Sequence, residues 1–169
     1  MKKLAILFLL ALLPFVAQAQ IKFGYLSYSQ ALKLMPDYAI AQTNLEQLRA
    51  QYDAETKRAS EEFVQKYETF LATQKNLAPV ILDKRQSELQ DLLYKNMQFK
   101  EEAQRLLAKA ETDAYAPLKA KLNAALAKIG AEKGLSFILN TDNDALPYIN
   151  SAEGEDLTVV VAEALSKGK

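Results

Sequence analysis

The side chains best suited to chemistry lie near the C-terminal end, where Asp142 and Asp144 are followed by Glu153. In a calcium-binding loop, acidic residues at these relative positions would supply oxygen ligands to the ion. Leu146, however, stands at a position that should carry a ligand, and Pro147 occupies the place where the sharp turn requires glycine. We therefore interpret the segment as a solvated hairpin loop and not as a metal site.

The composition offers little else for catalysis. The chain contains no histidine and no cysteine, which excludes Ser-His-Asp triads, thiol chemistry and the usual zinc sites. It has no phosphate-binding loop, and its carboxylates alternate with lysine and arginine, as on solvated helix faces. With a formal net charge of zero, the chain also lacks the basic excess of a nucleic-acid-binding protein. The sequence predicts a protein that is not an enzyme, with no cofactor, no metal and no nucleic-acid partner.

The first 19 residues have the features of a secretory signal peptide. Lys2 and Lys3 precede an apolar run from Leu4 to Leu13, and the segment Ala17-Gln18-Ala19 fits a cleavage site. We expect cleavage after Ala19 and no transmembrane anchor, whereas peripheral membrane association stays open. With no cysteine, the secreted protein gains no support from disulfides. An elongated domain of this kind is expected to complete its core by oligomerising.

The middle of the chain is unusually poor in helix-breaking residues. From Asp37 to Ile129 there is no glycine, and only Pro79 and Pro117 interrupt the stretch. Helices of that length must fold back on themselves, so we expect an antiparallel coiled-coil hairpin over residues 37–116 with its turn near 76–79. We expect a kink or break at Pro117, which would act as the hinge of the arm.

The two halves of this arm carry apolar or small residues at steps of three and four. The predicted seam consists of Ala41, Leu45, Leu48, Tyr52, Thr56, Ala59, Phe63 and Phe70 in the first half and of Leu89, Leu92, Asn96, Phe99, Ala103, Leu106 and Ala110 in the second. Asn96 either fixes the register of the two helices or points to solvent. Aromatic and methionine residues of the arm are candidates for contact with a client chain, or else belong to the seam: Phe63, Tyr67, Phe70, Tyr94 and Met97.

Residues 20–36 and 117–169 are expected to form a small β-rich body. Strands are predicted at 21–27, 135–139 and 147–150, and a final helix opens at Glu155 and Asp156. Three short strands are too few to close a core, so the body is expected to share strands between subunits. The alternating residues assigned to the body core and subunit interface are Ile21, Phe23, Tyr25, Leu135, Phe137 and Leu139. The predicted fold class is α+β, a β-barrel-type body with a long helical hairpin arm.

The order of these parts resembles the Skp/OmpH family of periplasmic chaperones over essentially the whole mature chain. The resemblance lies in the opening segment 23–27, the entry to the arm at 34–38, the return at 116–118, and the C-terminal segments 132–139, 146–149 and 156–158. It implies a homotrimer in which strands of three chains build a barrel, and three hairpins surround a cavity. It also implies ATP-independent holding of unfolded outer-membrane proteins in the periplasm until they reach the insertion machinery.

One departure from that family concerns charge. Its best-known members have strongly basic arms, whereas residues 37–130 carry 14 basic and 14 acidic side chains. Capture of clients by charge, and binding of lipopolysaccharide through a basic patch, are therefore not expected of this chain. An alternative with the same architecture is an envelope coiled-coil adaptor that binds one specific folded partner.

Overall fold

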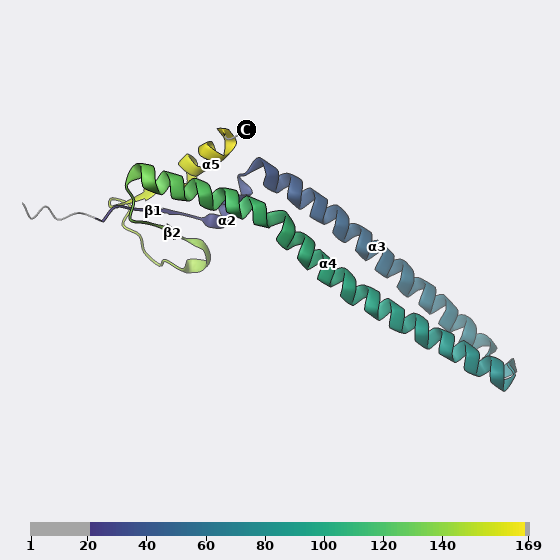
Figure 1. The fold of residues 1–169 in the computed structure, drawn as a ribbon. Helices are drawn as coiled ribbons and strands as arrows, with labels where there is room; N and C mark the ends of the chain where they lie inside the picture. Colours follow the sequence, from purple (N-terminus) through teal and green to yellow (C-terminus); the bar gives the residue numbers. More distant parts are fainter. Residues whose placement is uncertain (1–20, 168–169) are drawn as a thin grey trace, which may run out of the picture.

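The computed structural model describes residues 21–167. The predicted signal peptide, residues 1–19, lies outside the described residues. The described chain has a small body, which holds a three-stranded sheet, and one long helical arm that projects from it (Figure 1). The fold is mostly helical, with a small sheet, as the α+β prediction requires.

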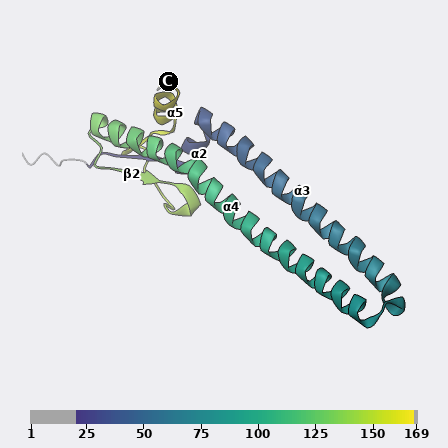
Figure 2. The same ribbon diagram turned by 45° about the vertical axis from the view of Figure 1, so that its right-hand side comes forward.

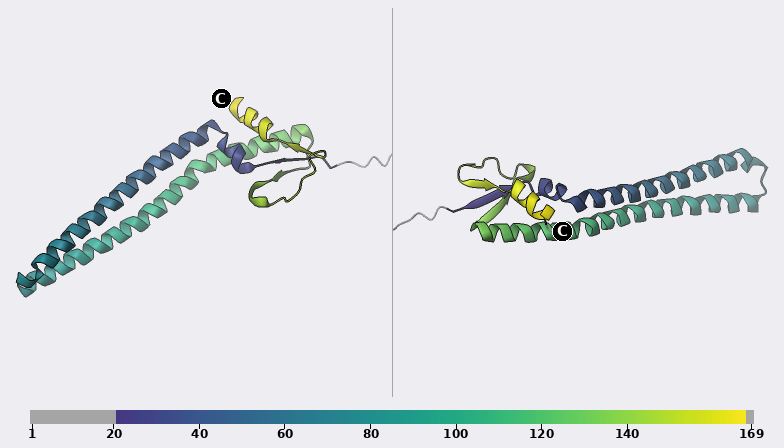
Figure 3. Two further views of the ribbon diagram at one scale, coloured as in Figure 1. Left: turned by 180° about the vertical axis from the view of Figure 1, so that it is seen from behind. Right: turned by 90° about the horizontal axis from the view of Figure 1, so that it is seen from above.

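The arm is a helical hairpin. Helix α3 (Pro36–Thr73) runs outward, a short 3-10 turn η2 (Gln74–Asn76) closes the tip, and helix α4 (Pro79–Lys133) returns to the body. Pro36 and Pro79 each stand in the first turn of their helix, where the missing N–H leaves no hydrogen bond unmade. The two helices lie side by side in every view (Figures 2 and 3), and the turn lies where the sequence predicts it.

The predicted seam is the line along which the two helices meet. All of its residues are half-buried except Ala103, which is buried, and no residue of α3 is fully buried. Tyr52 packs on Phe99 across the seam, with ring centroids 6.2 Å apart. A contact that leaves most of its side chains partly accessible is shallow, and much of each helix remains open to solvent.

Helix α4 passes through Pro117 without a break, so of the two outcomes expected there, a kink or a break, the break does not occur. Proline removes one backbone hydrogen bond from a helix interior, so neighbouring contacts must hold the helix together. On either side of Pro117, Tyr115 stacks on Tyr38 of α3 and Leu118 is buried in the body. The boundary expected between arm and body at 116/117 therefore falls inside one continuous helix, which changes direction as it enters the body (Figure 3).

The sheet has the strand order β2-β1-β3, and both pairings are parallel. Its strands are β1 (Phe23–Leu26), β2 (Phe137–Asn140) and β3 (Gly154–Asp156). The prediction of a third strand at 147–150 is wrong, since these residues form no strand and β3 lies further along the chain. Only glycine fits at position 154 beside β1, because a β-carbon there would clash with the ring of Phe23. The sheet of the described chain is open, and its outer strands are β2 and β3.

The body core lies between one face of the sheet and three helices: α2 (Tyr28–Lys33), the last part of α4, and α5 (Thr158–Lys167). Its buried side chains are Leu26, Ala31, Leu32, Met35, Leu118, Leu122, Ile129, Leu157, Val161 and Leu165. Helix α5 begins at Thr158, so the expectation that Glu155 and Asp156 open this helix is also wrong. Gly134, with a positive φ of 64°, ends α4 and turns the chain into β2.

Candidate functional site

The five arm residues predicted to contact a client occupy two different environments. Tyr67, Tyr94 and Met97 are exposed, with Tyr94 61% accessible. Phe63 and Phe70 are half-buried in the seam. Phe63 also stacks on Tyr67, with ring centroids 6.0 Å apart, so the seam continues into the exposed surface at this point. The structure thus places three of the five where another chain can reach them directly.

Sequence reasoning missed six further exposed apolar residues of the arm. Ile40 lies at its base and Val80 and Ile81 lie near its tip, and the other three are Val64, Leu71 and Leu93. Val64, Leu71 and Leu93 each immediately follow a seam residue, and so does Met97. A position one residue after the seam turns about 100° away from it and faces solvent on a fixed side of the helix. The sequence therefore contained enough information to find these residues, because each is an apolar residue that stands one position after a predicted seam residue.

Asn96 is turned toward the partner helix. Its side-chain nitrogen Nδ2 donates a hydrogen bond of 2.9 Å to the backbone carbonyl oxygen of Ala59 on α3. Of the two readings left open by the sequence, the structure supports the one in which Asn96 ties the helices together. Such a polar contact in an otherwise apolar seam favours one register over its neighbours.

The charged residues of the outer arm pair within their own helix. On α3, Glu55, Arg58, Glu62 and Lys66 form a chain of ion pairs, with closest N–O distances of 2.6, 3.2 and 2.6 Å. The hydrogen bond from Lys66, with a further contribution from Arg58, lowers the pKa of the Glu62 carboxyl. Exposed pairs of this kind give only weak support to the helix that carries them, because water and salt screen their charges. They do not hold α3 against α4.

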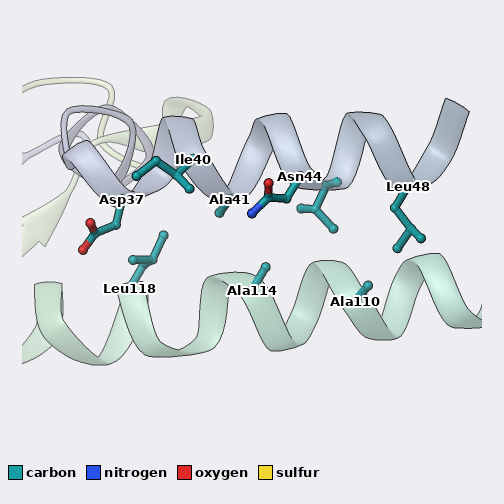
Figure 4. A pocket seen from close by; sticks show the side chains of 9 residues that line it. Asp37, Ile40, Ala41, Asn44, Leu48, Ala110, Ala114 and Leu118 are labelled. Atoms are coloured by element: carbon teal, nitrogen blue, oxygen red, sulfur yellow. The ribbon is translucent and has the colours of Figure 1, made fainter.

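At the base of the arm, α3 is fastened to α4 by specific contacts. Tyr38 and Tyr115 stack with ring centroids 5.2 Å apart, and burial raises the pKa of the Tyr115 phenol. Lys121 pairs with Asp37 at 3.7 Å. Beside them lies an apolar hollow of about 440 Å³ (Figure 4), lined by Asp37, Ile40, Ala41, Asn44, Leu45, Leu48, Ala110, Ala114 and Leu118. The short alanine side chains leave this space open between the helices.

The residues predicted for the body core and subunit interface lie on different sides of the sheet. Leu135 packs against the core of the chain. Phe23, Tyr25, Phe137 and Leu139 point to the opposite face and are half-buried or exposed, and Phe23 stacks on Phe137 at 5.7 Å. Ile21 precedes β1 and is 65% accessible. The described chain therefore leaves an apolar face of its sheet only partly covered.

The acidic segment at 142–144 has a structural role. The Asp142 carboxylate accepts hydrogen bonds from the Ser27 hydroxyl at 2.5 Å and from the Ser29 backbone N–H at 2.9 Å. These bonds, chiefly the one from Ser27, lower the pKa of Asp142. The side-chain oxygen of Asn140 accepts from the backbone N–H of Tyr28 at 3.1 Å. Together they fix the loop after β2 to the first turn of α2.

Within residues 21–167, no group of three or more acidic side chains is arranged to hold a metal ion. None of the helices in that part of the chain is long and apolar enough to cross a membrane.

The described residues thus form a small body with an open three-stranded sheet and a projecting helical hairpin. The sequence profile of the outer membrane protein (OmpH-like) family matches residues 22–165. The chain therefore belongs to the OmpH-like family, and this membership supports a chaperone-like role.

A crystal structure shows the same fold. It is that of an OmpH-like protein from Caulobacter crescentus CB15, a candidate outer membrane chaperone, which is 19% identical in sequence. The similarity covers 85% of this chain and 82% of that chain with a TM-score of 0.70. Comparison with curated protein sequences gave no significant match.

Proposed function

We propose that this protein is an ATP-independent periplasmic holdase, which binds unfolded outer-membrane proteins between helical arms and prevents their aggregation before membrane insertion. The observation that carries the proposal is the set of apolar side chains left exposed on an elongated arm: Ile40, Val64, Tyr67, Leu71, Val80, Ile81, Leu93, Tyr94 and Met97. Side chains of this kind make adaptable contacts with chains that have no fixed shape.

We further propose that three copies assemble through their bodies. Two features of the described chain support this. The sheet has open edges at β2 and β3, and its partly covered face carries Phe23, Tyr25, Phe137 and Leu139. Open edges and uncovered apolar sheet faces are normally paired or covered in stable proteins. A barrel shared by three chains would satisfy both, and would place three arms around one cavity.

The test is an aggregation assay with the mature protein, residues 20–169. Several unrelated outer-membrane proteins, diluted from urea, should remain soluble in the presence of the protein without nucleotide, at about one trimer per client. Light scattering would measure aggregation, and mass determination in solution would measure the oligomer. An adaptor with one folded partner would protect none of these clients, and that result would reject the holdase function.

A further inference from the structure

The charged and the apolar residues of the outer arm occupy different sides of the hairpin. The positions immediately before seam residues are mostly charged: Glu55, Arg58, Glu62, Glu88, Asp91 and Lys95. We call this set the charged face. Beyond Thr56 on α3 and before Phe99 on α4, the positions immediately after the seam residues carry no charge, whereas nearer the body Asp53, Lys57 and Lys100 stand at such positions. Together with Tyr67, four residues after Phe63, the uncharged positions of this outer part are Ser60, Val64, Tyr67, Leu71, Gln90, Leu93 and Met97. We call this second set the uncharged face.

Helix geometry places each set on one side of the whole hairpin. Two antiparallel helices are related by a two-fold axis perpendicular to the plane that contains them. Rotation about that axis exchanges the two helices but leaves the same side of the hairpin facing the viewer, and both helices are right-handed. Positions that follow the seam on α3 therefore share a side with positions that follow the seam on α4.

A groove near the base of the arm shows the same relation directly. Its lining includes Gln42, Glu46 and Arg49 of α3 together with Leu107 and Glu111 of α4. Every one of these residues immediately follows a seam residue. The groove is thus formed from both helices on the side that, further out, becomes the uncharged face.

We propose that the uncharged face binds segments of unfolded chain in extended conformation whose alternate side chains are apolar, and that the charged face does not bind them. This inference rests on the proposed holdase function and specifies its binding surface. The ion pairs of the charged face keep that surface hydrated, because a client laid across it would strip water from Glu62 and its partners. The uncharged face presents no such cost.

The spacing of the apolar residues favours an extended client. One helical turn rises about 5.4 Å, and Leu93 and Met97 are four residues apart, about 6 Å along the axis. In an extended strand, side chains on one side recur about every 6.6–6.8 Å. A chain running along the arm can therefore place one alternate side chain against each turn. Transmembrane strands of outer-membrane barrels have this alternating pattern of apolar residues.

The test compares two variants with the same number of substitutions to the same residue. The first changes the uncharged face with Val64→Gln, Leu71→Gln and Leu93→Gln. The second is the matched control on the charged face, with Glu62→Gln, Glu88→Gln and Lys95→Gln. All six side chains lie outside the body core, and glutamine is a good helix former, so both variants should keep the wild-type helix content and oligomeric mass. Affinity for a denatured outer-membrane protein is measured by fluorescence.

We expect the uncharged-face variant to bind at least about tenfold more weakly, since three apolar contacts are lost, and the control to bind as the wild type does. The wild-type affinity should change less than about twofold between low and physiological salt, because screening acts on charges. Equal affinity of the first variant and the wild type, or equal loss in both variants, would overturn the inference. A changed oligomeric mass in the first variant would also overturn it, by showing that a second copy covers this face.

Two peptides of identical composition complete the test. One alternates valine and threonine, and the other has the same residues in blocks. Tighter binding of the alternating peptide supports the extended-client geometry, and equal binding contradicts it. If the wild-type protein fails to protect any client, the holdase function itself is wrong. If it protects clients but the two variants do not differ, only the choice of face is wrong.

Discussion

Adding one methyl group at Gly24 tests how β1 packs against the body. A β-carbon at this position would lie 2.5 Å from Cδ1 and 2.9 Å from Cγ of Leu157, and 3.0 Å from Cδ1 of Leu135. Leu157 has no accessible surface, so its side chain has no open space into which it can move. The Gly24→Ala substitution therefore forces an extra methyl group into the closed space between β1 and Leu157, the residue that precedes α5.

The magnitude follows from two opposing effects. Overpacking of a closed core costs about 1–3 kcal/mol. Replacing glycine by alanine in a strand recovers about 0.5–1 kcal/mol, because the unfolded chain loses conformational freedom. The middle of these ranges gives a net loss of about 1 kcal/mol, with an upper limit of about 2.5 kcal/mol, and for a chain of this size a loss of about 1 kcal/mol lowers the melting temperature by about 2–4 °C.

Gly130→Ala is the matched control with the opposite sign. A β-carbon at Gly130, inside α4, would meet only Cδ1 of Ile138, at the ordinary contact distance of 3.5 Å. Alanine favours the helix, so this variant should be more stable by about 0.5–1 kcal/mol. Thermal and urea unfolding, followed by circular dichroism at one fixed protein concentration, would measure both. A Gly24→Ala protein as stable as the wild type would refute the packing described for β1.

Three further predictions concern single residues. Asn96→Ala removes the hydrogen bond to the Ala59 carbonyl, so the free energy of unfolding should fall by about 1 kcal/mol, and an unchanged urea midpoint would contradict the interhelical role. Asp142→Asn should lower the melting temperature at pH 7. Because the pKa of Asp142 is depressed in the folded state, the difference from the wild type should shrink as the pH falls below about 4, and a constant difference would contradict the hydrogen-bond pattern. Pro117→Ala restores an N–H inside α4 and should raise stability by up to about 3 kcal/mol, with slower amide hydrogen exchange near that position; no gain would mean that the helix is already distorted there.

The arm could be predicted almost completely from the sequence. Helices form through hydrogen bonds between residues four apart, so the absence of glycine and the steps of three and four already contain the information. The turn before Pro79 and the half-buried seam were both expected and both occur. The exposed apolar residues Val64, Leu71 and Leu93 were within reach of the same reasoning, because their positions follow from the seam.

The body was decided by contacts between distant parts of the chain. Strand propensity favoured 147–150, yet β3 forms at Gly154–Asp156, where a glycine leaves room for the ring of Phe23. The valines at 159–161 suit a strand, but Val161 and Leu165 fill the core at helical spacing, and burial overrides local preference. Pro117 remains helical because packing on both sides offsets its missing hydrogen bond. Local sequence is therefore enough to specify the helices of the arm. Which distant strands pair, and which sheet face stays partly open, depends instead on packing between side chains more than a hundred residues apart.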